Sequence, residues 1–158
     1  MARLLIVGAG CHGRELGARM AASGWRVRGT TRGREHLAAI EAAGIEPALA
    51  DPDRPAEALE LVADVSVILY LLGSLDGPAA AIHGPRLERL LEKLVDTPVR
   101  GFLYEATGSV ASEILAGGCG LIAEASARTR IPTAALSVPR AAPDWLGRAE
   151  AALLSLLG

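Results

Sequence analysis

LLIVGAGCHGRELG, residues 4–17, begins with four apolar side chains and runs directly into a glycine-rich turn. Gly8, Gly10 and Gly13 follow the spacing G-x-G-x-x-G, and a helix-forming segment begins near Cys11. A strand, a glycine turn and a helix in this order are typical of folds that bind a dinucleotide. The first glycine permits the tight turn, the second lets the backbone approach a pyrophosphate, and the third lets the helix pack closely on the sheet. The helix N-terminus then offers N–H groups and a partial positive charge to phosphates.

The composition indicates a globular protein without an affinity for nucleic acid or membranes. The chain has 158 residues, of which 51% are hydrophobic and 22% charged, and its net charge is −2. This length predicts a single domain over residues 1–158. No apolar run reaches the roughly 20 residues that span a bilayer, and the N-terminus lacks the pattern of a signal peptide, so we expect a cytoplasmic protein. Two cysteines and three scattered histidines give no metal-ligand spacing, so no metal is predicted.

Strand-like and helix-like segments alternate along the whole chain. Strands are expected at residues 4–7, 25–30, 45–50, 64–72, 101–106 and 132–138. Helices are expected at 11–22, 34–43, 55–62, 85–95, 110–115, 121–128 and 142–157, with Ser109 as a cap and glycines 117, 118 and 120 as an interruption. The alternation predicts an α/β, three-layer fold, in which helices cover both faces of a parallel sheet of about six strands. Leucines of the helices at 85–95 and 142–157 offer apolar surface for a possible homodimer.

Several stretches resemble the short-chain dehydrogenase/reductase superfamily, above all its extended and atypical NAD(P)-binding branch. They are GAGCHGREL (8–16), WRVRGTTR (25–32), GIEPALADP (44–52), ADVSVILYLLG (63–73) and RGFLYEATGSV (100–110). This branch includes sugar-nucleotide epimerases and NmrA-like proteins. The resemblance covers roughly residues 2 to 110 and implies a Rossmann fold, with the cofactor lying across the carboxyl ends of the strands.

The resemblance also implies which residues would contact the cofactor. It puts the pyrophosphate on the three motif glycines, with the backbone of Cys11 and His12 over it. Asp51 matches the family's acidic residue near the adenine, although an Asp-Pro pair also forms turns on its own account. After the fourth strand, the residues expected to line the adenosine and ribose side are Leu71, Leu72 and Gly73.

The end of the second strand points to NADP rather than NAD. An NAD-preferring site carries a carboxylate there, which binds the ribose 2′-hydroxyl and repels a 2′-phosphate. This sequence has Thr30, Thr31 and Arg32 instead, and a guanidinium binds phosphate through a planar fork. Arg14 and Arg34 would add positive charge to the same pocket. The alternative is that these arginines are ordinary solvated charges.

The catalytic pair of the family is absent. Its members use a tyrosine followed four residues later by a lysine, but no Tyr-x-x-x-Lys occurs here, and Lys93 is the only lysine. Glu105 and Thr107 are weak catalytic candidates, because the carboxyl end of a parallel strand is where ligands bind. Glu105 could equally be a salt-bridged or solvated residue at a strand end. His12 and His83 are better explained as loop residues than as catalysts.

Two functions of different kinds remain open. The first is a cofactor-binding sensor or assembly subunit without standard short-chain dehydrogenase catalysis. The second is an atypical NADP-dependent oxidoreductase or a nucleotide-sugar epimerase or reductase. A methyltransferase is disfavoured, because such sites usually carry an acid where Thr30, Thr31 and Arg32 stand.

Overall fold

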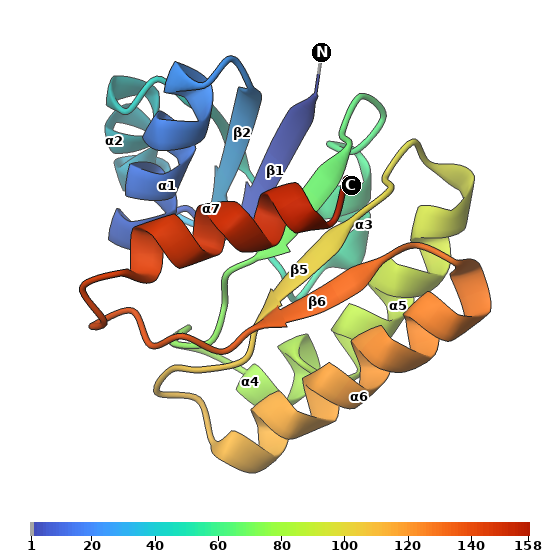
Figure 1. Ribbon diagram of the computed structural model, residues 1–158. Coiled ribbons are helices and arrows are strands. Elements are labelled where there is room, and N and C mark those ends of the chain that lie inside the picture. Colours follow the sequence, from blue (N-terminus) through green and yellow to red (C-terminus); the bar gives the residue numbers. More distant parts are fainter. Residues whose placement is uncertain (1) are drawn as a thin grey trace.

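A parallel sheet of six strands forms the centre of the structure, a computed structural model that describes residues 2–158 (Figure 1). In spatial order the strands are β3 (Glu46–Leu49), β2 (Arg26–Thr31), β1 (Arg3–Val7), β4 (Val67–Tyr70), β5 (Phe102–Glu105) and β6 (Thr133–Leu136). Every neighbouring pair is parallel. This order reverses direction between β1 and β4, as in Rossmann folds, and it confirms the predicted fold class.

Helices cover both faces of the sheet (Figure 1). One face carries α1 (Cys11–Ala22), α2 (Leu37–Ala42) and α7 (Trp145–Ser155), and the other α3 (Pro55–Leu59), α4 (Ala79–Ile82), α5 (Pro85–Lys93) and α6 (Ser112–Thr129). Short 3₁₀ turns, η1 (Arg34–His36) and η2 (Leu94–Asp96), precede α2 and follow α5. Each face has its own core, and the alternation of side chains along β1 sends Leu4 and Ile6 to one and Leu5 and Val7 to the other.

The segment after β5 differs from the prediction, because α6 is one continuous helix of 18 residues. Two helices separated by glycines were expected, and that prediction is wrong. Gly118 lies against the Tyr104 hydroxyl, where a Cβ atom would overlap the oxygen. Burial of Leu115 and Ile122 on the same helix face outweighs the weak helix propensity of glycine, which costs about 1 kcal/mol per residue. The helix begins after Ala111, so Ser109 is not its cap.

The leucine-rich helices direct their apolar side chains into the core of the chain. Leu87, Leu90, Leu91 and Leu94 are at most 4% exposed, and Leu153 of α7 is fully buried. Most of the apolar surface predicted for a homodimer therefore lies inside the chain, whereas Val95 and Leu154 of these two segments are exposed.

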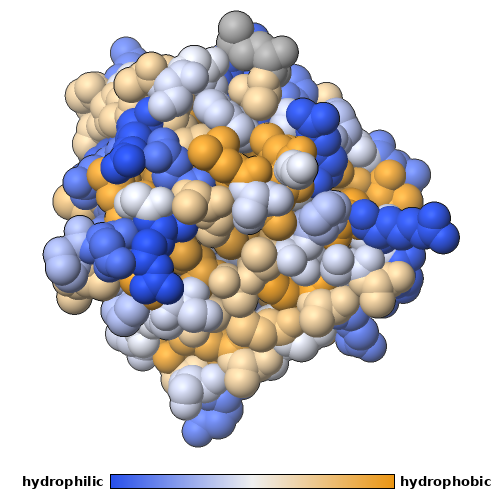
Figure 2. Space-filling model, in the orientation of Figure 1, coloured by the Kyte–Doolittle hydropathy of each residue, from blue (hydrophilic) through white to orange (hydrophobic). Residues whose placement is uncertain are grey.

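On the surface, apolar and polar residues are interspersed over the face shown in Figure 2. Large apolar side chains that are exposed lie on separate elements, and they are Leu49, Val95 and Leu154. None of the helices formed by residues 2–158 has both the length and the apolar character that crossing a membrane requires.

Ion pairs link the strands near their amino ends. Arg3, which is only 4% exposed, lies 2.7 Å from Glu46 and 3.2 Å from Asp64. Arg28 contacts the same two carboxylates at 3.2 and 3.1 Å. These four side chains join β1, β2, β3 and the segment before β4 at the amino ends of the strands. A cavity lies at the opposite side, at the carboxyl ends of the strands.

Candidate functional site

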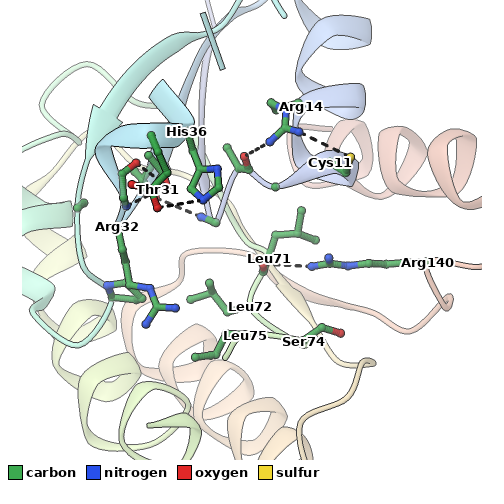
Figure 3. A pocket seen from close by; sticks show the side chains of 18 residues that line it. Cys11, Arg14, Thr31, Arg32, His36, Leu71, Leu72, Ser74, Leu75 and Arg140 are labelled. Carbon is green, nitrogen blue, oxygen red and sulfur yellow. Dashed lines mark hydrogen bonds and ion pairs between the residues drawn. The ribbon is translucent and has the colours of Figure 1, made fainter. Parts of the chain in front are cut away.

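A cavity of about 760 Å³ opens at the carboxyl ends of β1, β2 and β4 (Figure 3). Its volume lies within the range of about 300–1,000 Å³ that is usual for small-molecule sites. It is lined by Gly8, Ala9, Gly10, Cys11, Arg14, Thr30, Thr31, Arg32, Gly33, Glu35, His36, Ala50, Pro52, Leu71, Leu72, Ser74, Leu75 and Arg140. Nine of the fourteen residues predicted to contact a cofactor are in this lining.

The glycine turn between β1 and α1 forms one wall of the cavity. Gly8 has a φ of +95°, and a Cβ atom on it would lie 2.7 Å from the carbonyl oxygen of Leu71. No atom lies within 4 Å of the position of a Cβ on Gly10, so the backbone is open to the cavity at this point. The Gly8 N–H donates to Oγ1 of Thr30 at 3.1 Å. The buried Thr30 therefore fixes the turn from the neighbouring strand.

The N-terminus of α1 is suited to an anionic group. No side chain caps this helix, and its first turn contains no acidic residue. Its first N–H groups are therefore left for water or a ligand, at the positive end of the helix dipole. Arg14 adds a positive charge beside them, and its guanidinium donates to the carbonyl oxygen of Ala9 at 3.3 Å and to Sγ of Cys11 at 3.6 Å.

The end of β2 brings a second cationic group to the cavity. Nη2 of Arg32 donates to the carbonyl oxygen of Asp76 at 2.6 Å, which ties it to the loop after β4. The Thr31 hydroxyl accepts from the Gly33 N–H at 3.3 Å. Glu35 also lines the cavity, and its carboxylate lies 3.5 Å from Nε2 of His36. This edge of the cavity thus holds one guanidinium and one exposed carboxylate.

The remaining predicted contacts lie outside the lining, and two of them have packing roles. A Cβ atom on Gly13 would lie 3.2 Å from both the Gly8 carbonyl oxygen and Ile6, so this glycine permits the close approach of α1 to the sheet. The ring of His12 packs edge-on against Trp145, with 5.2 Å between the ring centroids.

Three other predicted residues near the cavity do not line it. Arg34 is exposed on η1. Oδ1 of Asp51 accepts from the Asp53 N–H at 2.9 Å, which is the turn-forming alternative for this residue. Gly73 is buried, and its N–H donates to Oε1 of Glu105 at 2.7 Å.

The buried carboxylate of Glu105 is fully engaged within the protein. Besides the Gly73 N–H, it accepts hydrogen bonds of 2.8 Å from both Nε and Nη2 of Arg140, and its residue is 0% exposed. The salt-bridged alternative for Glu105 therefore describes the structure. Thr107 does not line the cavity either, and its hydroxyl donates to the Val138 carbonyl oxygen at 3.4 Å.

Both tyrosines lie in the core beneath α5 and α6 rather than in the cavity. The Tyr70 hydroxyl donates to the Ile82 carbonyl oxygen at 2.8 Å. His83 lies 2.8 Å from the Leu72 carbonyl oxygen through Nε2 and 2.6 Å from the Tyr104 hydroxyl through Nδ1. Because a carbonyl only accepts, Nε2 carries the proton and Nδ1 accepts from Tyr104. Burial raises the pKa of both phenols above the usual value, and neither tyrosine lines the cavity.

Sequence reasoning missed half of the lining, in two different ways. Eight missed residues are close neighbours of predicted ones: Ala9, Gly33, Glu35, His36, Ala50, Pro52, Ser74 and Leu75. Their position at the cavity can be worked out from the ends of the strands once the register of the sheet is known. Arg140 is different, because it comes from the loop after β6, where the sequence carries no motif. In residues 2–158 no group of three or more His, Cys, Asp or Glu side chains is placed to hold a metal ion.

Comparisons with known proteins support the fold. No family model matches the chain, and no curated protein matches its sequence. Solved structures do match, among them a mutant UDP-glucuronic acid 4-epimerase from Bacillus cereus in complex with NAD and a fluorinated UDP-sugar, at a TM-score of 0.70 and 17% identity. The Citrobacter sp. triphenylmethane reductase complexed with NADP(H) matches at 0.63 and 18%, and vestitone reductase from alfalfa at 0.67 and 14%.

These matches cover 90%, 84% and 88% of this chain, but only 59%, 48% and 57% of the respective solved chains. The chain therefore spans about half to three-fifths of their length. At such identities the likeness shows the fold alone. The resemblance to NAD(P)-dependent epimerases and reductases is confirmed at that level.

Proposed function

We propose that this chain is an NAD(P)-binding Rossmann protein that prefers NADP(H), with residues 1–158 acting as one domain. The observation that carries the proposal is a single cavity that joins an uncapped helix N-terminus to Arg32 at the end of β2. Both of these parts of the cavity suit phosphate groups, since one offers backbone N–H donors and the other a guanidinium.

The residues present fit such a cofactor. The turn at Gly8 and Gly10 and the first N–H groups of α1 would hold the pyrophosphate, with Arg14 adding positive charge. Thr31 and Arg32 would bind a 2′-phosphate, while Leu71 and Leu72 would line the ribose side. When bound, the nicotinamide would supply the capacity to accept or donate a hydride.

Glu35 opposes this preference, because a carboxylate near a 2′-phosphate is repulsive. Its side chain is 73% exposed, so solvent and salt screen its charge. Arg32 is held against the cavity wall by the carbonyl oxygen of Asp76. We therefore expect the attraction of Arg32 to exceed the repulsion of Glu35.

The protein is proposed to act without standard short-chain dehydrogenase catalysis, as a cofactor-binding sensor or an assembly subunit. The reason is the position of the tyrosines, whose hydroxyls are bound in the core, and of Lys93, which is exposed on α5. A second candidate is an atypical NADP-dependent oxidoreductase or a nucleotide-sugar epimerase or reductase. The fold likeness to epimerases and reductases favours it, as does the exposed hydroxyl-bearing Ser74 in the cavity lining.

Calorimetric titration with NADPH and NADH side by side tests the cofactor proposal. We expect NADPH to bind about tenfold more tightly, which corresponds to about 1.4 kcal/mol for the 2′-phosphate. Binding of neither dinucleotide would refute the proposal, and tighter binding of NADH would refute the preference.

A screen of aldehydes, ketones and nucleotide sugars for NADPH oxidation separates the two candidate functions. If the protein binds NADPH but turns over none of these compounds, the result supports the sensor or assembly subunit. Turnover of any of these compounds supports the enzyme instead.

A further inference from the structure

Arg140 lies at the far end of the cavity from Arg32 (Figure 3). Figure 3 shows its guanidinium reaching toward Leu71, whose carbonyl oxygen accepts from Nη2 at 3.3 Å. Nε and Nη2 also form the paired hydrogen bonds to Glu105. One guanidinium therefore connects the loop after β4, the end of β5 and the loop after β6.

This arrangement leaves one nitrogen of Arg140 available to a ligand. Nη1 makes no hydrogen bond to any residue in the described part of the chain, and the side chain is 26% exposed in the cavity lining. Glu105 balances the charge of the guanidinium at 2.8 Å. Nη1 is therefore a well-oriented donor without a large net charge, which suits a hydroxyl, carbonyl or amide oxygen better than a second carboxylate or phosphate.

Glu105 keeps this donor in place. A buried carboxylate is costly unless it is paired and hydrogen-bonded, and Glu105 satisfies that demand through Arg140 and the Gly73 N–H. The fork geometry fixes the plane of the guanidinium, and with it the direction of Nη1. Glu105 thus acts on a ligand only through Arg140 and through the loop after β4.

We propose that Nη1 of Arg140 donates a hydrogen bond to an oxygen of the nicotinamide-ribose half of the bound dinucleotide, with Glu105 as its positioning residue. This inference rests on the proposed function, and it follows from the strand order. A dinucleotide with its 2′-phosphate at β2 and its pyrophosphate over the turn after β1 next reaches the loop after β4, because β4 is the other neighbour of β1. Arg140 is the cationic residue of the lining on that side.

The double variant Glu105→Gln/Arg140→Met tests the assignment. It removes both partners of the buried pair, so no buried charge is left uncompensated, and the amide oxygen of the introduced glutamine can still accept from the Gly73 N–H. It also leaves the net charge unchanged. The matched control is Asp144→Asn/Arg148→Met, which neutralises an exposed pair at the N-terminal end of α7, outside the cavity.

Calorimetric titration with two ligands distinguishes the adenosine half of the cavity from the nicotinamide half. NADPH spans both halves, whereas adenosine 2′,5′-bisphosphate carries the 2′-phosphate but no nicotinamide ribose. In the double variant we expect NADPH to bind about tenfold more weakly, the effect of losing one well-oriented hydrogen bond, and the bisphosphate to bind as in the wild type. The control should bind both probes normally.

Unchanged NADPH affinity in the double variant would overturn the inference while leaving the proposed function intact. Equal losses for both probes would also overturn it, since Arg140 would then not act on one half alone. If neither probe binds to the wild type, it is the proposed function that fails. Should the double variant not fold, Arg140→Lys replaces it. A lysine keeps the charge but cannot hold the fork and present a further donor, so the same selective loss of NADPH affinity is expected, and normal NADPH binding would overturn the inference.

Discussion

At the scale of single residues, the three arginines in the cavity differ in how their charge is balanced. Arg14 and Arg32 donate to backbone carbonyl oxygens, whereas Arg140 faces a buried carboxylate. A carbonyl orients a guanidinium without neutralising it. Arg14 and Arg32 thus retain the charge that a phosphate requires, and Arg140 offers mainly a directed N–H group.

Arg32→Ala should weaken the binding of NADPH by about tenfold and leave that of NADH nearly unchanged, because only NADPH carries a 2′-phosphate. Arg34→Ala is the matched control, since Arg34 is exposed two residues away and does not line the cavity. Titration calorimetry on the three proteins measures both affinities. Equal losses for the two dinucleotides in Arg32→Ala would contradict the role assigned to this side chain.

The difference between Arg32 and Arg140 explains what the sequence can reveal of a site. Arg32 directly follows β2, the next strand along the chain after the glycine turn and α1, so local pattern and strand order place it at the cavity. Arg140 reaches the cavity through a buried pair with Glu105, a residue distant in the sequence. No local pattern encodes that pairing, although a charged residue within the apolar β5 was a signal that a partner was needed.

At the scale of secondary-structure elements, α6 shows tertiary packing overriding local propensity. Its glycines predict a break, but the helix continues because its apolar side is buried against β5 and β6. The glycines are not equivalent. Gly118 is buried against Tyr104, whereas Gly117 is exposed and has no atom within 4 Å of a Cβ position.

Gly118→Ala should lower the free energy of unfolding by about 1–3 kcal/mol, because the added methyl group displaces the Tyr104 hydroxyl from its bond to His83. Gly117→Ala should raise it by about 0.5–1 kcal/mol through helix propensity alone. Urea denaturation followed by circular dichroism measures both changes. A gain of stability in Gly118→Ala would show that the contact between α6 and β5 is looser than the structure indicates.

At the scale of the whole molecule, stability depends on a neutral histidine in the core. Burial lowers the pKa of His83, more than its bond to the Leu72 carbonyl and the charge of Glu105 raise it. Between the lowered pKa and the usual value near 6.5, the unfolded chain binds a proton that the folded chain does not. The contribution of neutral His83 to stability is therefore complete above about pH 6.5 and falls as the pH decreases through that value.

His83→Gln should make the free energy of unfolding less dependent on pH, because glutamine does not titrate while its amide can still donate to the Leu72 carbonyl oxygen. Urea denaturation at about pH 7.5 and about pH 5.5, on either side of the usual histidine pKa, measures the difference for wild type and variant. His12 and His36 are present in both proteins and give a common background. An equally large fall in the variant would assign the acid sensitivity to other groups.

The amino ends and the carboxyl ends of the strands have different roles. Arg3, Arg28, Glu46 and Asp64 hold the strands together at the amino ends, while the cavity groups occupy loops at the carboxyl ends. Substitutions in the loops can accordingly accumulate without loosening the strands. Ligand specificity can therefore change through loop substitutions while the sheet stays the same. This agrees with the occurrence of the fold, at 17–18% identity to this chain, in one protein solved with NAD and another solved with NADP(H).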